Sequence, residues 1–450
     1  MSKRAAEAAE HATTPSATTG TGSRAFLAPT PADLILRDVE RHAEHPDALS
    51  NTGVMLHLTG AVPDLAELRR HVAARLPDFP CLTHVLDRDG PTARWMPAVP
   101  DMDHHIQAQH IDAGPQALDA AVRGLLGEPW PEEVPAWRLI LLHGHVPNGF
   151  VLLYLTHHAL QDAGSILAVL EALFGPPMDA EQSTAVARGV PHTPRLRPGQ
   201  VLRSTMVLLR RAGKHHRWTS PAHPLSSRRH LMLTHAPATW LRTTARAGDA
   251  STNDVNLTAL ADAIAGWAKT AWPRAADLPI PVMIPINLRT AEEVTAPGNR
   301  LFMARIDLPG GTMPPLQRLA RTRTLTHQLK STEHKAVLRA ALTRLPMWPF
   351  QRLVALMTAP GRLTLGASYV VVRHRLRYGD AEVDRIDPLM FCPPGAPMAV
   401  AVFVYGHEAS ACFRIDEALP GAGSLPARWR QALDDMAAQA VPTSSAGDLR

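Results

Sequence analysis

The chain has 450 residues, of which 45% are hydrophobic and 19% charged, and its formal net charge is +5. This length predicts two domains, or two similar halves, because single hydrophobic cores rarely grow so large. Arginines are spread along the chain and only 5% of the residues are aromatic, so the sequence argues against nucleic-acid binding.

Residues 1–24 contain no apolar segment of the kind found in signal peptides, and we expect a disordered tail there. The three cysteines, Cys81, Cys392 and Cys412, lie too far apart for a CxxC metal site or a dense disulfide framework. This pattern favours a reducing, cytoplasmic location. No apolar run reaches the roughly 18 residues that a membrane span requires.

The first third of the sequence alternates helical and strand-like patterns. Thr30 and Pro31 are typical of a helix start, and residues 64–76 have helical apolar spacing, whereas residues 92–99 resemble a strand. Two apolar runs between residues 137 and 156 flank the turn dipeptide Asn148-Gly149 and predict a β-hairpin. Its second strand is apolar on both faces, which is typical of a central, buried strand.

The pattern continues with a helix at 164–174 and then weakens over residues 176–235, which are rich in Pro, Arg and His. We interpret that segment as a solvated crossover rather than as a phosphate- or lipid-binding surface. A helix at 251–267 follows. Strict alternation at 281–289 then predicts a strand with Val282, Ile284, Ile286 and Leu288 on the core face and Met283, Asn287 and Arg289 opposite. A second hairpin at 398–415 completes a mixed α/β chain in two halves of similar size.

His157 and His158 stand where the central strand should leave the core, and Asp162 follows four residues later. A neutral, oriented imidazole is well suited to accept a proton near pH 7. The alternative is a pair of satisfied polar residues at a strand end, followed by an N-cap aspartate. A metal site lacks a third ligand at useful spacing, and Ser165 lacks the GxSxG context of a serine hydrolase.

The segment "HHALQDA" resembles the HHxxxDG motif of the superfamily of condensation domains and CoA-dependent acyltransferases. Further segments are similar to its wax ester synthase/diacylglycerol acyltransferase branch, in the family's order: "FLAPTPADLILRDVERHAEHP", "DMDHHI", "PAWRLILLHGHVPNGFVLLYLTHHALQDAGS", "NDVNLTALADAI" and "PINLRTAEEVTAPGNRLFMARIDLP". Together they cover most of residues 25–310.

The resemblance implies a fold of two chloramphenicol-acetyltransferase-like halves that form a V-shaped pseudo-dimer with a central tunnel. It places the tail at 1–24, an N-terminal half at 25–178, a crossover linker at 179–235 and a C-terminal half at 236–450.

The resemblance also implies roles for individual residues. His158 would be the general base that deprotonates an alcohol or amine as it attacks an acyl thioester. Asp162 would be structural and would pair with Arg289 or Arg300, and His157 would shape the loop. Substrate contacts are expected from Ala163, Gly164, Asn253, Asp254, Asn287 and Arg289. No cofactor is implied beyond the donor substrate, which is acyl-CoA or an acyl carrier protein.

Two departures from the family pattern bear on the substrate. Ala163 occupies the position of the motif glycine, and residues 366–380 replace a stretch that is typical of storage-lipid enzymes. These changes favour a specialised acceptor. The stretch 336–357 mixes Arg with Leu, Trp and Phe and is interpreted as packed amphipathic helices, with peripheral membrane contact as the alternative.

Three other functions remain open from the sequence. A condensation enzyme with a carrier-bound donor is the nearest alternative. A non-catalytic binding or scaffold protein belongs to a different class. An epimerase or cyclase on the same scaffold is the third, because one fold hosts several chemistries.

Overall fold

The structure is a computed structural model that describes residues 28–41, 45–87, 93–176, 224–226, 228–290, 293–327, 337–340, 364–393 and 395–440, with a few isolated positions between them. The expected tail at 1–24 lies outside the described residues. Most of the predicted crossover at 179–235 and of the stretch 336–357 lies outside them too.

The first sheet has six strands in the order β11-β12-β1-β6-β5-β4, antiparallel except for the parallel pair β4 and β5. Its strands are β1 (Asn51–Thr59), β4 (Ile106–His110), β5 (Trp137–His143), β6 (Gly149–His157), β11 (Arg377–Tyr378) and β12 (Ala381–Leu389). The other elements of this half are the hairpin β2 (His84–Asp87) and β3 (Arg94–Pro97), and the helices α1 (Pro31–Arg41), α2 (Leu65–Ala73), α3 (Met102–His105), α4 (Pro115–Leu126) and α5 (Ala163–Phe174).

The second sheet also has six strands, in the order β7-β14-β13-β10-β8-β9. Its strands are β7 (Arg229–Pro237), β8 (Ile280–Asn287), β9 (Leu301–Leu308), β10 (Leu365–Val372), β13 (Met398–Tyr405) and β14 (Glu408–Asp416). The helices that accompany it are α8 (Ala238–Ala247), α9 (Thr252–Ala271), α10 (Pro315–His327) and α13 (Leu425–Ala440). Short 3-10 turns lie at Pro46–Ala48, Leu76–Asp78, Pro80–Leu82, Pro273–Ala275 and Ala422–Ser424.

Local sequence patterns account for most of these elements. The expected hairpin is β5 and β6, joined at Asn148, whose φ of 57° lies in the left-handed region that Asn tolerates. Every residue of β6 is buried, as expected for a central strand. The expected helices at 164–174 and 251–267 are α5 and α9. The second hairpin is β13 and β14, which turns at Gly406 with a φ of 56°.

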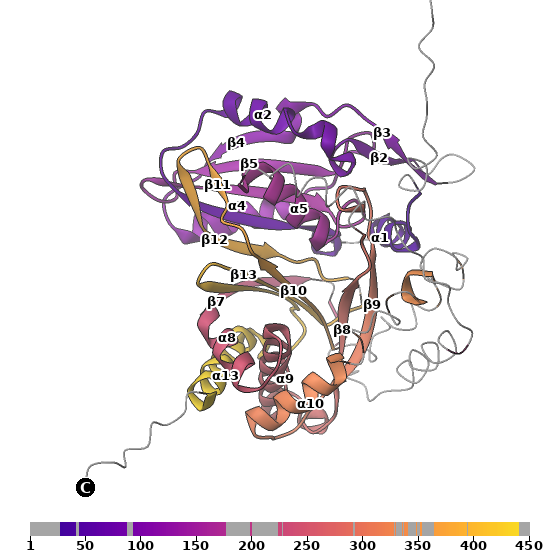
Figure 1. Cartoon of the computed structure of the whole chain (residues 1–450), viewed down its shortest axis with the longest axis vertical. Coiled ribbons are helices and arrows are strands. Elements are labelled where there is room, and N and C mark those ends of the chain that lie inside the picture. Colours follow the sequence, from indigo (N-terminus) through magenta and orange to yellow (C-terminus); the bar gives the residue numbers. More distant parts are fainter. Residues whose placement is uncertain are drawn as a thin grey trace, which may run out of the picture.

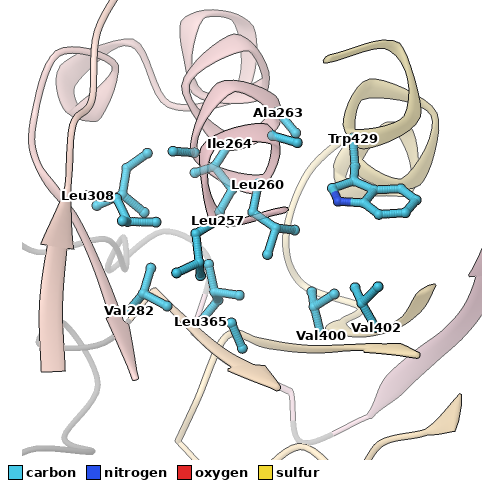
Figure 2. Close-up of a cluster of buried hydrophobic side chains, with 14 of the residues drawn as sticks. Leu257, Leu260, Ala263, Ile264, Val282, Leu308, Leu365, Val400, Val402 and Trp429 are labelled. Carbon is cyan, nitrogen blue, oxygen red and sulfur yellow. The ribbon is translucent and has the colours of Figure 1, made fainter. Parts of the chain in front are cut away.

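The predicted alternation along β8 is confirmed. Its core-face residues pack with α9, β10, β13 and α13 in the main core of the C-terminal half (Figure 2). Met283, on the opposite face, is buried in a smaller cluster with Cys392, Ala396 and Ala399. The strand therefore presents apolar side chains to both of its faces.

The two halves are joined more closely than a simple division of the sequence suggests. β12 belongs by sequence to the C-terminal half, yet it pairs antiparallel with β1 in the first sheet, and Figure 1 shows β11 and β12 lying with the strands of the N-terminal half. β7 already begins at Arg229, within the range expected as linker. The two halves are confirmed, but β11 and β12 from the C-terminal part of the sequence belong to the sheet of the N-terminal half. The expected tunnel between them stays a prediction.

An apolar cluster continues from one half into the other. Met55 on β1 and Leu389 on β12 pack with Leu231 on β7 and Cys412 on β14. Burial of this shared apolar surface stabilises the arrangement of the two sheets. The three cysteines are free and buried, and among the described residues no helix is long and apolar enough to cross a membrane.

A cluster of polar side chains around Asp387 also joins the two halves. The buried Asp387 on β12 accepts from His57 Nε2 on β1 and from His235 Nε2 on β7, each at 2.8 Å, and from Arg385 Nε at 3.1 Å. Burial alone would raise the pKa of Asp387, but the hydrogen bonds from His235 and His57, together with the charge of Arg385, hold it well below its ordinary value of 3.8. One ionised carboxylate thus links β1, β12 and β7.

Asp387→Asn should lower the free energy of unfolding by about 1–3 kcal/mol at pH 7, because the variant loses the charged acceptor shared by the two histidines. The pKa of Asp387 is depressed in the folded state, so its contribution is complete above pH 3.8 and is lost as the pH falls below that value. Urea unfolding at pH 7 and at acid pH measures both effects. Equal stability of the two proteins at pH 7 would contradict this role.

Candidate active site

The loop that follows β6 is held from both halves of the chain. The backbone N–H of His158 donates to Ser50 O at 2.8 Å, and the carbonyl of His158 accepts from Asn299 Nδ2 at 2.8 Å. Ser50 directly precedes β1, and Asn299 lies just before β9. His158 therefore has a fixed backbone at the junction of the two halves.

His157 points into the protein and is buried. Its Nδ1 accepts from the backbone N–H of Ala159 at 2.9 Å, while its own backbone N–H donates to Ala136 O at 2.9 Å. An Nδ1 that accepts a hydrogen bond places the ring proton on Nε2. These contacts are those of a residue that shapes the turn.

Asp162 caps α5 and collects three hydrogen bonds. Its Oδ1 accepts from Ser165 N, and its Oδ2 accepts from Arg289 Nη2 and from Arg300 N, all at 2.9 Å. Burial alone would raise the pKa of Asp162, but the charge of Arg289 and these hydrogen bonds hold it below its ordinary value. Both expected arginines are thus in place: Arg289 contributes its side chain, and Arg300 its backbone N–H.

Both terminal nitrogens of the Arg289 guanidinium donate hydrogen bonds to other protein groups. Nη2 also donates to Gly298 O at 2.7 Å, and Nη1 donates to Glu293 O and to Ala296 O. The side chain is 3% exposed, so the Asp162–Arg289 pair is a buried ion pair with further hydrogen bonds. A substrate-binding role for Arg289 stays a prediction, since these contacts are structural.

The structure gathers several of the expected substrate-binding residues at the start of α5. A Cβ added at Gly164 would lie 3.3 Å from Asp162 Oδ1, 3.8 Å from Asn287 Nδ2 and 3.9 Å from Arg289 Nε. Asn287 is exposed, and its Oδ1 accepts from Arg289 N at 2.9 Å. Ala163 is the first residue of α5 and is partly exposed. Gly164 and Asn287 therefore lie close to the Asp162–Arg289 pair.

Asn253 and Asp254 lie in the first turn of α9. Asp254 forms a capping box with Ser251 and accepts from Thr326 Oγ1 at 2.6 Å. Its carboxylate therefore stabilises the helix start and the packing of α10. The expected contact of Asn253 and Asp254 with substrate stays a prediction.

The imidazole of His158 has a mixed environment. It packs against the ring of Phe391 with a centroid distance of 4.6 Å, and its Nδ1 is buried without a hydrogen-bond partner among the described residues, although the residue as a whole keeps some exposure. Burial lowers the pKa of His158, while the charge of Asp162 opposes this effect. The ring is therefore neutral near pH 7 and able to accept a proton.

A small pocket borders the loop at His157, Ala159 and Leu160. Its other walls come from Arg37 of α1, from the β2–β3 hairpin and from residues 131–136. The Cys81 thiol is a second potentially reactive group near the loop, because Gln161 Nε2 donates to Cys81 O. Burial, however, raises the pKa of this thiol to about 12. Cys81 is thus a poor nucleophile.

Three residues at this site were not identified from the sequence: Asn299, Phe391 and Asp33. Asn299 belongs to the segment "GNR", whose three residues each hold one residue of the loop. No local sequence pattern identified Phe391 as a residue of the site. Asp33, in the first turn of α1, is completely buried, which only the tertiary structure reveals. The described residues hold no group of three or more side chains arranged to bind a metal ion.

Asp162→Asn should lower the free energy of unfolding by about 3–5 kcal/mol, because it leaves the buried Arg289 without a counter-charge. Asparagine retains the ability to cap α5, so the loss reports the ion pair rather than the cap. Urea unfolding at pH 7 measures the change. A variant as stable as the wild type would show that the ion pair contributes little to stability.

No sequence-family model matches the chain, and no curated protein matches its sequence. Its structure is similar to that of the wax ester synthase/diacylglycerol acyltransferase from Marinobacter aquaeolei VT8, with a TM-score of 0.57 and 14% identity over 92% of this chain and 100% of the other. The condensation domain from the monacolin K polyketide synthase MokA matches with a TM-score of 0.62 and 12% identity, over 92% of this chain and 97% of the other.

A mutant starter condensation domain of rhizomide synthetase, in complex with C8-CoA and Leu-SNAC, matches with a TM-score of 0.65 and 14% identity. That comparison covers 94% of this chain and 97% of the other. The chain therefore has the two-halved α/β fold of wax ester synthases and condensation domains.

Proposed function

We propose that the chain is an acyltransferase that moves an acyl group from a thioester to a hydroxyl or amine, with His158 as the general base. The observation that carries this proposal is the setting of His158. A backbone held from both halves presents an imidazole whose Nδ1 is buried and whose pKa is lowered. The shared fold supports the same class of reaction by analogy.

In the proposed reaction, Nε2 of His158 takes the proton of the acceptor O–H or N–H as its oxygen or nitrogen attacks the thioester carbonyl. The carbon–sulfur bond then breaks, and the leaving thiolate takes the proton back from His158. The products are an ester or amide and a free thiol. No covalent acyl-enzyme and no cofactor takes part, and the buried Cys81 thiol is not required.

The donor is proposed to be acyl-CoA. The mutant rhizomide starter condensation domain was solved with C8-CoA, which supports CoA as a donor on this fold. A carrier-bound acyl donor is the second candidate, favoured by the similarity to condensation domains from synthetases. Presenting the same acyl chain on CoA and on a carrier protein decides between them.

The departures at Ala163 and at 366–380 favour a specialised alcohol or amine over a storage lipid. We place the reaction in the cytoplasm, with peripheral membrane contact through 336–357 as a further hypothesis. A non-catalytic scaffold on the same fold remains the alternative from another class. It predicts no turnover with any donor and no effect of changing His158.

His158→Ala should lower kcat for acyl transfer by about 10²–10⁴-fold, because the acceptor loses its general base. Thiol release from acyl-CoAs of several chain lengths, with mixed alcohols and amines and mass identification of the products, measures the change. His110→Ala, which alters an exposed histidine on β4, is the matched control and should behave as the wild type. Equal product formation by His158→Ala and wild type would exclude His158 as the base.

The pH dependence of kcat/KM should show an acid limb with its midpoint below 6.5. A base must be neutral to act, and burial lowers the pKa of His158 from that ordinary value, so the active form persists to lower pH than for a free histidine. Initial rates between about pH 4 and 8, with stability checked at each pH, measure the limb. A midpoint above 6.5 would contradict this assignment.

A further inference from the structure

Asp33 is a buried carboxylate that the proposed reaction does not use. It lies in the first turn of α1 with no solvent exposure. Its Oδ2 accepts from Thr30 N, and its Oδ1 accepts both from Asn299 N and from Asn299 Nδ2, all at 2.7 Å. Two of these three hydrogen bonds come from a single residue more than 260 positions away in the sequence. Asp33 therefore determines where Asn299 lies.

The side-chain amide of Asn299 connects Asp33 to His158. One Nδ2–H donates to Asp33 Oδ1 at 2.7 Å and the other to the His158 carbonyl at 2.8 Å. The His158 carbonyl can only accept, so Nδ2, and not Oδ1, must face it. The amide thus has a single orientation, and its Oδ1 is directed away from Asp33.

The neighbouring residues hold Asn299 in register with the loop. Gly298 N donates to Leu160 O at 2.6 Å, and Arg300 N donates to Asp162 Oδ2 at 2.9 Å. Gly298 has a φ of 85°, and a Cβ there would lie 2.4 Å from Asp33 Oδ2. Only glycine permits both this backbone conformation and the close approach of the carboxylate. Residues 298–300 therefore clamp the loop between His158 and Asp162.

Two buried polar atoms of this group lack a hydrogen-bond partner among the described residues: Asn299 Oδ1 and His158 Nδ1. Such atoms are rare and call for an explanation. Burial lowers the pKa of His158, whereas the charge of Asp162, the backbone of His158 itself and, to a smaller extent, the Asn299 amide act in the opposite direction. The unpaired acceptor of Asn299 and the unpaired ring nitrogen of His158 thus belong to two residues that are already joined through Asn299 Nδ2 and the His158 carbonyl. Catalytic hydrogen bonds are often formed fully only when substrate binds.

We propose that Asp33 and Asn299 are positioning residues for His158. Asp33 orients the Asn299 amide, whose Nδ2 holds the His158 carbonyl and whose Oδ1 receives Nδ1–H of the imidazole, so that Nε2 keeps its lone pair for the acceptor proton. A base with its proton on the wrong nitrogen cannot take part in this transfer. This inference rests on the proposed role of His158 as the base.

Asn299→Ala and Asp33→Asn test the proposal. Each should lower kcat about 10–100-fold, as is typical when a partner that orients a catalytic histidine is removed, and should change the KM of the acyl donor less than about twofold. Asp416→Asn is the matched control. It alters another fully buried carboxylate, which pairs with Arg229 and accepts from Ser226 N and Ala418 N in the C-terminal half. It should lower the Tm and leave kcat of the folded protein unchanged.

A second measurement does not depend on activity. In protein labelled with ¹⁵N-histidine, the ring signals of His158, assigned by their loss in His158→Gln, report which nitrogen carries the proton. The wild type should show the proton on Nδ1, and Asn299→Ala should show a mixture or the Nε2–H form. If Asp33→Asn fails to fold, Asn299→Ala decides alone, because it keeps the contacts of Asp33 with Thr30 N and Asn299 N.

The outcomes separate this inference from the proposed function. An unchanged tautomer in Asn299→Ala, with kcat within about twofold of wild type, overturns the positioning role while acyl transfer stands. A changed tautomer in a protein that transfers no acyl group supports the positioning role and removes the proposed function. If kcat of Asp416→Asn falls as much as kcat of Asp33→Asn and Asn299→Ala, the loss reflects a structural role alone and the inference is overturned.

Discussion

The carboxylate of Asp162 has to be satisfied in a place that water hardly reaches, and this requirement shapes the whole site. A buried charge is tolerated only when a counter-charge and hydrogen-bond donors surround it. Asp162 obtains them from the start of α5, from Arg289 beyond the end of β8 and from Arg300 before β9. The loop, the helix that follows it and the C-terminal half are therefore held in one arrangement.

The exchange of strands between the halves supports that arrangement. β12 completes the first sheet beside β1, and the apolar cluster that includes Met55 and Leu231 continues across the interface. A separation of the halves would break sheet hydrogen bonds as well as expose apolar surface. Strand pairing and apolar contacts thus hold the two halves together. The loop with His158 lies between these halves, and its backbone stays hydrogen-bonded to Asn299.

Local sequence patterns were sufficient for much of the fold. The turn at Asn148, the buried β6, the alternation along β8 and the capped start of α9 each follow from short-range physical chemistry and appear in the structure as expected. The loop at His157 and His158 was found in the same way, because a buried strand must end where polar residues begin. The two candidate arginine partners of Asp162 came from the family resemblance rather than from a local pattern, and the resemblance did not choose between them.

The sequence by itself determined which segments become helices and strands, because periodicity and turn chemistry act between residues a few positions apart. It also determined that an imidazole stands at the end of a buried strand. Only the tertiary structure decided that β12 joins the first sheet, that Arg289 rather than Arg300 gives its side chain to Asp162, and that Asp33 holds Asn299. Those contacts join residues far apart in the chain. Their geometry depends on how the two sheets pack, which no local pattern encodes.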